Sequence, residues 1–305
     1  MTIPPTLDAL LPEDVAKKAE TTGIAKAQRD PMTLLALSVL AGAFIALGAM
    51  FSTLVATGLE GELPFGLARL IPALAFSLGL ILVVVCGAEL FTGDVLMTIA
   101  WASGRLTLGD MLRAWALILA GNLVGAVGTA VLVYISGHWL MADMQVGVQA
   151  VKIAAAKASL PVGMAFWRGV LCNVLVCLAV WGSLAARSVT DKILVVILPV
   201  TAFVAAGFEH SVANFYYLTL GWLLRLLSPS EFLMLLSQEE IATGAISARH
   251  VLPTQAAVIS GNLVGGACLV ALTYWLAYLR PRRALPVAPV AIAAEDQTPR
   301  RNNPG

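Results

Sequence analysis

The sequence has few charged residues and contains long segments with none. Asp, Glu, Lys and Arg together make up 12% of the 305 residues, whereas hydrophobic residues make up 59%. Residues 34–59 and 114–135 contain no charged residue at all. A water-soluble domain needs about 25% charged residues, so this shortage excludes an ordinary soluble fold. The composition therefore predicts an integral membrane protein.

Features typical of other protein classes are also missing. The four cysteines lie in apolar segments without Cys-x-x-Cys spacing, so we expect small packing residues and neither disulfides nor a metal site. The sequence has no phosphate-binding loop and no Gly-x-Ser-x-Gly motif, so we predict no enzyme activity and no cofactor. The net charge of +1, without a basic stripe between aromatic residues, argues against a nucleic-acid partner.

The apolar segments predict six membrane spans. About 20 residues of helix cross the roughly 30 Å of hydrocarbon in a bilayer. The predicted spans are residues 33–57, 66–103, 110–136, 161–187, 192–227 and 252–279. Most Lys and Arg residues fall on the side of the two termini, so we expect both termini to be cytoplasmic. The predicted organisation is a cytoplasmic N-terminal segment (1–30), a six-span channel domain (31–281) and a disordered cytoplasmic tail (282–305).

The second and fifth of these spans are too long to be single straight helices. As unbroken helices they would reach about 50 Å at roughly 1.5 Å per residue. Polar, glycine-containing segments at residues 87–94 and 206–214 interrupt the two apolar runs, the second of them after Pro199. Non-helical backbone at this depth needs burial in protein or a water-filled cavity. We therefore predict that both spans break at mid-membrane.

Short repeats relate the two halves of the sequence. The pattern Gly-x-Glu at residues 87–89 recurs at 207–209, and GNLVG at 121–125 recurs at 261–265. These matches indicate a duplicated three-span unit, whose copies have opposite orientation because three is odd. We therefore expect an all-α membrane protein of six helices in two inverted three-helix repeats, resembling aquaporins. A solute pathway is expected where the broken helices meet.

Several polar residues at the breaks are candidates for function. His210 can change its charge near neutral pH and can donate a hydrogen bond to an anion. Thr92 either offers its hydroxyl to the same pathway or bonds its own helix backbone. Glu89 and Glu209 are costly in a membrane, and we expect them to support the broken backbone rather than to contact the solute.

Five further polar residues are candidates for structural or functional roles. Asn122 and Asn262 stand in Gly-x-x-x-Gly motifs, which predicts a structural role at close helix contacts. Asn173 lies in an apolar segment and either lines a pore or holds a break in place. We place Lys152 and Lys157 in an exterior loop before the fourth span, where they either concentrate anions or are simply solvated.

Longer motifs resemble a known family over nearly the whole chain. They include residues 76–82 (FSLGLIL), 86–92 (CGAELFT), 121–125 (GNLVG), 173–181 (NVLVCLAVW) and 207–214 (GFEHSVAN). Their sequence and order resemble the formate/nitrite transporter family of pentameric, aquaporin-like anion channels. The resemblance implies a homopentamer in a bacterial-type cytoplasmic membrane.

The resemblance also implies roles for particular residues. A narrow pore would pass through each protomer, with His210 at its centre and Thr92 and Asn173 nearby. Phe76 and Phe203 match the exterior constriction of such pores. Residues that match constrictions nearer the cytoplasm are Leu80, Leu90, Phe91 and Val176. Lys157 matches an exterior vestibule lysine, and the expected supports of the breaks are Glu89, Glu209, Asn214, Asn122 and Asn262.

These observations give one main hypothesis and several alternatives. The sequence looks closest to the formate channels, although residues 92–94 depart from them and residues 168–173 look more like the nitrite branch. We expect a channel for a small monovalent anion, formate first, with nitrite or hydrosulfide as alternatives. Protons are expected partners if His210 protonates the anion; otherwise His210 pairs with it as a cation.

Two further functions remain as rivals. A neutral-solute channel of aquaporin type would also have two half-membrane breaks, but the paired Asn-Pro-Ala signatures are missing. A membrane anchor subunit without transport activity would leave the two polar breaks unexplained.

Overall fold

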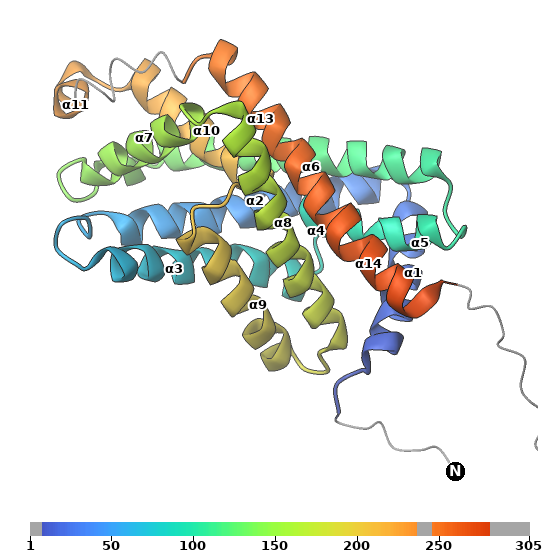
Figure 1. Cartoon of the computed structure of the whole chain (residues 1–305). Helices are drawn as coiled ribbons and strands as arrows, with labels where there is room; N and C mark the ends of the chain where they lie inside the picture. Colours follow the sequence, from blue (N-terminus) through green and yellow to red (C-terminus); the bar gives the residue numbers. More distant parts are fainter. Residues whose placement is uncertain (1–7, 237–245, 281–305) are drawn as a thin grey trace, which may run out of the picture.

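The computed structural model describes residues 8–236 and 246–280, and these residues form an elongated helical bundle (Figure 1). In this part of the chain the extended pairing is limited to one isolated bridge between Glu60 and Leu63. The expected all-helical class is therefore confirmed for the described residues. The whole of the predicted C-terminal tail, 282–305, lies outside them.

Helices occupy all of the predicted apolar segments, and further helices lie outside them. Those before residue 141 are α1 (Pro12–Ala27), α2 (Pro31–Ala56), α3 (Phe65–Cys86), α4 (Phe91–Asp94), η1 (Val95–Met97), α5 (Thr98–Ala102), α6 (Leu108–Ile135) and η2 (His138–Leu140). Those after it are α7 (Gln145–Ala158), α8 (Val162–Ala185), α9 (Val189–Ala205), α10 (Ser211–Leu227), α11 (Ser230–Leu235), α13 (Ala248–Leu263), η4 (Val264–Ala271), α14 (Leu272–Tyr274) and η5 (Trp275–Leu279). The last four run on without a break as one helix.

Length and apolar composition qualify five of the described helices as membrane spans. They are α2, α3, α6, α8 and the continuous helix from Ala248 to Leu279. The fifth predicted span instead divides into α9 and α10, of 17 residues each. Pro199 lies inside α9 and does not end it, since the helix continues to Ala205.

Apolar side chains cover the outside of the bundle and polar ones fill parts of its interior. Leu132 and Leu198 are 67% and 75% exposed, whereas Asn122, Asn173 and Asn262 are 0% exposed. In a water-soluble protein, leucine side chains are mostly buried and asparagine side chains are mostly exposed. The distribution fits lipid as the surrounding solvent.

Small residues allow the long helices to pack closely. A Cβ atom at Gly125 in α6 would overlap the carbonyl oxygen of Val39 in α2. In the second half of the chain, a Cβ at Gly265 would overlap the carbonyl oxygen of Val170 in α8. The repeated GNLVG motif thus sits at two equivalent helix contacts, α6 on α2 and α13–η4 on α8.

The segment that precedes α8 is a helix, so the expectation of an exterior loop around Lys152 and Lys157 is wrong. Residues 145–158 form α7, and its buried positions recur every three or four residues, as on one face of a helix. This face packs on α10. The segment is rich in alanine, which has the highest helix propensity. Because the apolar content of this segment is modest, its hydropathy did not indicate a short amphipathic helix.

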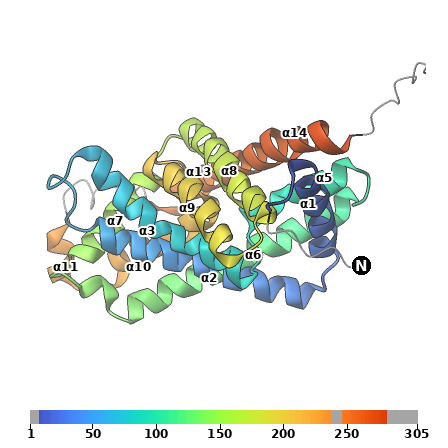
Figure 2. The ribbon, with the colours of Figure 1, turned by 90° about the horizontal axis from the view of Figure 1, so that it is seen from below.

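The described part of the N-terminal segment, from residue 8 onward, also belongs to the bundle. Helix α1 begins at Pro12 and packs against η1 and α5. These two short helices belong to the part of the second predicted span that follows its interruption. Figure 2 shows α1 and α5 side by side at the end of the molecule opposite α11. This position brings the C-terminal end of α1 close to the first interruption.

Candidate functional site

Two interruptions of helical structure occupy the positions expected from the sequence. Gly87 ends α3 and Gly207 follows the end of α9, both with left-handed φ angles, of 77° and 74°. In both cases the N–H of the next residue bonds the carbonyl five residues earlier at 3.0 Å. Glycine adopts this backbone conformation without the steric strain of a side chain, which explains the glycine in both Gly-x-Glu motifs.

Asn122 of α6 bonds the backbone on both sides of the first interruption. Its Oδ1 accepts the N–H of Phe91 at 2.8 Å, and its Nδ2 donates to the carbonyl of Glu89 at 2.9 Å. The N–H of Glu89 donates to the carbonyl of Leu37 at 3.2 Å. Backbone groups that leave a helix inside a membrane protein need such partners, because lipid offers none.

Asn262 of α13 repeats this arrangement at the second interruption. Its Oδ1 accepts the N–H of Ser211 at 3.0 Å, and its Nδ2 donates to the carbonyl of Glu209 at 3.0 Å. The N–H of Glu209 donates to the carbonyl of Arg168 at 3.3 Å. The two interruptions are therefore built from matching residues and matching bonds.

The two interruptions meet at Thr92 and His210. The Thr92 hydroxyl oxygen lies 3.0 Å from Nε2 of His210, and the two residues are 0% and 3% exposed. Nδ1 of His210 accepts the N–H of Ala213 at 3.2 Å, so the histidine caps the start of α10. Because Nδ1 acts as an acceptor, the proton of the neutral ring lies on Nε2, facing Thr92.

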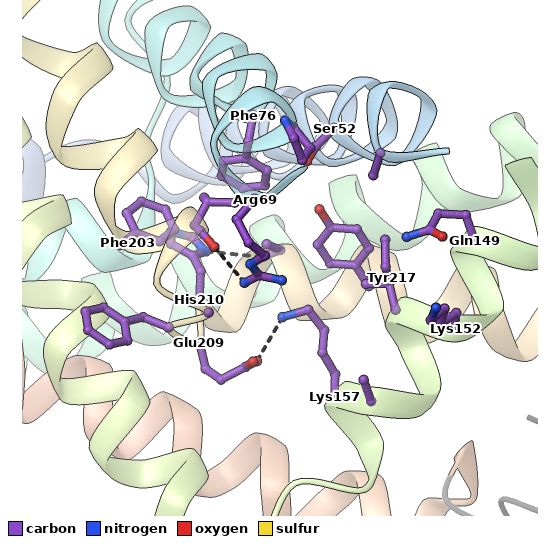
Figure 3. Close-up of a pocket in the computed structure, with 18 of the residues that line it drawn as sticks. Ser52, Arg69, Phe76, Gln149, Lys152, Lys157, Phe203, Glu209, His210 and Tyr217 are labelled. Atoms are coloured by element: carbon purple, nitrogen blue, oxygen red, sulfur yellow. Dashed lines mark hydrogen bonds and ion pairs between the residues drawn. The ribbon is translucent and has the colours of Figure 1, made fainter. Parts of the chain in front are cut away.

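An open cavity of about 390 Å³ reaches His210 (Figure 3). His210, Phe76 and Phe203 line its deep end. The Phe203 ring stacks on the His210 imidazole with centroids 5.9 Å apart, and the Phe76 ring meets Phe203 edge-on at 5.9 Å. The two phenylalanines and the histidine thus form one continuous group of rings between the cavity and Thr92.

Charged side chains surround the rest of this cavity. Lys157 of α7 pairs with Glu209 at 3.0 Å, and Asn214 donates to the same carboxylate oxygen at 2.8 Å. Lys152 pairs with Glu60. Arg69 donates to the carbonyls at the end of α9, at 3.0 and 3.2 Å. Arginine and lysine outnumber the two carboxylates in the lining, so the cavity favours anions.

The remaining sequence-predicted residues lie deeper in the molecule. Asn173 donates to the carbonyl of Asn262 at 2.7 Å, and its Oδ1 has no hydrogen-bond partner among the described residues. Neither Asn173 nor Thr92 lines the open cavity. The predicted inner constriction residues are all buried in the apolar core that also contains Phe76 and Phe203; they are Leu80, Leu90, Phe91 and Val176.

A buried ionic cluster at the first interruption was missed by the sequence analysis. Lys26 of α1 lies 2.8 Å from Glu89 and 2.5 Å from Asp94, and Arg29 also pairs with Glu89. Burial lowers the pKa of Lys26, but the carboxylates of Asp94 and Glu89 outweigh this effect and raise it above its usual value. The acid at position 94 was a visible signal, whereas its partner Lys26 lies 68 residues away in the sequence.

Tyr217 was missed as well. It lines the cavity, and the Lys157 ammonium lies 5.3 Å from the centre of its ring. An aromatic residue in an apolar span gave no signal that separated it from a core residue. Residues 8–236 and 246–280 contain no cluster of His, Cys, Asp and Glu that would hold a metal ion.

Comparisons with known proteins agree with this geometry. The family described as "Formate/nitrite transporter" matches residues 13–276. The formate channel FocA of Escherichia coli is 41% identical over 274 residues, covering 90% of this chain and 96% of FocA. The nitrite transporter NirC of Escherichia coli is 32% identical over 264 residues, covering 85% and 88% of the two chains.

The fold has solved relatives too. A pentameric formate channel with formate bound superposes with a TM-score of 0.76 at 36% identity, covering 82% of this chain and 98% of that one. An ion channel of the same family superposes with a TM-score of 0.74 at 29% identity, covering 87% and 98%. The chain therefore belongs to the formate/nitrite transporter family.

Proposed function

We propose that the protein is a membrane channel for small monovalent anions, with formate as the preferred solute. The observation that carries this proposal is the contact between Thr92 and His210, where two interrupted helices meet below a cation-lined cavity. Membership of the family and the similarity to formate channels over nearly the whole chain support the choice of solute.

The architecture we propose has six spans in two inverted repeats, with α3–α5 and α9–α10 as the interrupted spans. The matching bonds of Asn122 and Asn262 support a duplicated origin. We further propose that both termini are cytoplasmic and that five copies assemble, as in the pentameric relative. Each protomer would then have its own pore in the inner membrane.

In this proposal the anion enters the cavity and passes Phe76 and Phe203 to reach His210 and Thr92. It then crosses the apolar inner segment formed by Leu80, Leu90, Phe91 and Val176. A bare charge is costly between apolar side chains, so the polar contact at the centre must lower the barrier. Glu89, Glu209, Asn214, Asn122 and Asn262 keep the interruptions open, and Asn173 orients the backbone of Asn262.

The bonds of His210 suggest how it acts. With Nδ1 occupied by the N–H of Ala213, a neutral ring donates from Nε2 to Thr92 or to an anion. If the ring were a cation at rest, its Nδ1–H group and the N–H of Ala213 would point at each other. We therefore propose a neutral resting histidine. In proton-coupled passage, Nδ1 gives up the Ala213 bond and takes a proton that enters from the aqueous cavity with the anion. Nε2 then passes its own proton to the anion, which leaves as the neutral acid, and the ring is neutral again with its proton on Nδ1.

The first test replaces His210 with Asn, which keeps a hydrogen-bonding side chain but cannot carry a proton. We expect formate flux into proteoliposomes to lose its dependence on pH. The matched control is His138→Asn, because His138 lies in the connector after α6 and outside the cavity. Unchanged, equally pH-dependent flux in the His210 variant would exclude the proton role.

The preferred anion is tested separately. Similarity to NirC and the residues at 168–173 favour nitrite as the second candidate. Competition among formate, nitrite, acetate, lactate and hydrosulfide in liposomes of the purified protein ranks them directly. Swelling assays with glycerol distinguish a neutral-solute channel, and flux from the isolated protein would exclude a subunit that only anchors other proteins.

A further inference from the structure

We propose that the hydroxyl groups of Tyr217 and Ser52, together with the Lys157 ammonium, form an anion-binding subsite in the cavity, outside the phenylalanine constriction. The subsite would hold a small planar anion with two acceptor oxygens before it reaches His210. This inference rests on the proposed anion channel and adds a specificity-determining residue, Tyr217, to it.

The register of α10 places Tyr217 on the same face as the central histidine. Tyr217 is seven residues after His210 and three after Asn214, so the three side chains share one face of the helix. Both Tyr217 and His210 line the cavity. An anion that travels along this face would therefore meet Tyr217 before His210.

The hydroxyl of Tyr217 points across the cavity toward Ser52 of α2 (Figure 3). Two neighbouring hydroxyl groups contain two donor protons, and a hydrogen bond between them would use only one of them. The other proton is left for a solute in the cavity. Both residues line this cavity, and Tyr217 is only 7% exposed, so water competes weakly for the bond.

Lys157 holds the tyrosine ring and supplies positive charge at the same place. Its ammonium lies 5.3 Å from the ring centre and 3.0 Å from the Glu209 carboxylate. The contact with the ring needs only the aromatic face, which phenylalanine provides equally. The tyrosine hydroxyl is therefore not required for packing or for the cation contact, and its position facing the cavity calls for another role.

The chemistry of the subsite selects among small anions. Hydroxyl and ammonium donors bond carboxylate and nitrite oxygens well, because these oxygens concentrate negative charge. Hydrosulfide is a weaker acceptor. Removing the Tyr217 hydroxyl should therefore weaken capture of formate and nitrite more than capture of hydrosulfide.

The test compares Tyr217→Phe with Tyr216→Phe in proteoliposomes. Tyr216 is the neighbouring tyrosine on the same helix; it is 1% exposed and does not line the cavity. We measure initial formate influx against formate concentration. Loss of one hydrogen bond to an anion predicts a half-saturating concentration about ten- to hundredfold higher in Tyr217→Phe, with hydrosulfide influx changed less than twofold. Tyr216→Phe should match the wild type.

A second variant, Ser52→Ala, should shift the same concentration in the same direction. If Tyr217→Phe and Tyr216→Phe both match the wild type while the wild type transports formate, the subsite is overturned and the channel function stands. An equal shift for all anions would also overturn it, because that result indicates a change of shape. Absence of formate flux in the wild type would instead overturn the proposed function.

Discussion

At the scale of single residues, the buried charges at the first interruption are the most consequential. Glu89 and Asp94 are 2% and 4% exposed, and their countercharges come from Lys26 and Arg29. A buried carboxylate without a partner is strongly destabilising, whereas a paired one is tolerated. Helix α1 thus supplies the charge of Lys26 to this buried cluster, in addition to its packing contacts with neighbouring helices.

We predict that Lys26→Met destabilises the protein by about 3–5 kcal/mol, because it leaves Asp94 without a countercharge. Thermal unfolding in detergent measures this change. Lys17→Met on the exposed face of α1 is the matched control and should have little effect, since Lys17 and Glu13 are both solvent-exposed. Adding Asp94→Asn to Lys26→Met should recover much of the loss; no recovery would contradict the role of the ion pair.

The charge of Lys26 should not change in the ordinary pH range. Its folded-state pKa is raised, so the stabilisation that this charge contributes is complete below the usual lysine pKa of about 10.4 and is lost only as the pH rises through the higher folded-state value. The loss of stability in Lys26→Met should nevertheless shrink as the pH falls toward about 5, because Asp94 without its countercharge takes up a proton instead of staying a buried charge.

Single residues differ in how far the sequence could predict their surroundings. The isolation of Glu89, Glu209 and His210 in apolar segments was enough to mark them as candidates for function or support. Their partners were not predictable in the same way, because Lys26 is 63 residues from Glu89 and looks like any basic residue of a polar leader segment. A pairing between distant parts of the chain leaves no local pattern.

At the scale of helices, the interruptions could be predicted and the connecting segment could not. Length and glycine placement identified both breaks, since a membrane of fixed thickness limits a straight helix. Helix α7 lacks such a constraint, because an amphipathic helix of 14 residues is too short to cross a membrane and resembles a loop in overall polarity. The same hydropathy that located the spans therefore gave no information on α7.

The contact of α6 with α2 requires glycine at position 125 but not at position 128, one turn later. We predict that Gly125→Ala costs about 1–3 kcal/mol, because the added methyl group would overlap the carbonyl oxygen of Val39. Gly128→Ala in the same helix is the control, since no atom lies within 4 Å of the added carbon. It should be neutral or slightly stabilising. Thermal unfolding and the yield of folded protein measure both, and equal behaviour of the two variants would contradict the packing argument.

At the scale of the whole molecule, the cavity and helix α1 lie toward opposite ends. The cavity is lined by residues of α7 and the segment before α3, whereas α1 packs near α5 (Figures 1 and 2). In the proposed orientation, with both termini in the cytoplasm, the cavity would face the exterior. The fold of one chain is the same whichever way the protein is inserted in the membrane. The orientation must therefore be tested by a measurement across an intact membrane.

Thiol labelling in intact cells provides that measurement. In a variant whose four cysteines are replaced by alanine, we predict that Gln149→Cys in the cavity reacts with a membrane-impermeant thiol reagent added outside. Thr21→Cys on the exposed face of α1 should react only after the membrane is permeabilised. The reverse pattern would show that the termini are exterior.

The ionic contacts of α1 also affect how the chain can be shortened for experiments. The first thirty residues are polar and precede every apolar span, so they resemble a segment that a protein engineer would remove. Removal past Arg29 would take away both countercharges of Glu89 and leave two acids beside the turn between α3 and α4. A loss of transport after such a truncation would reflect collapse of that turn, and it would be misread as evidence for a gating domain.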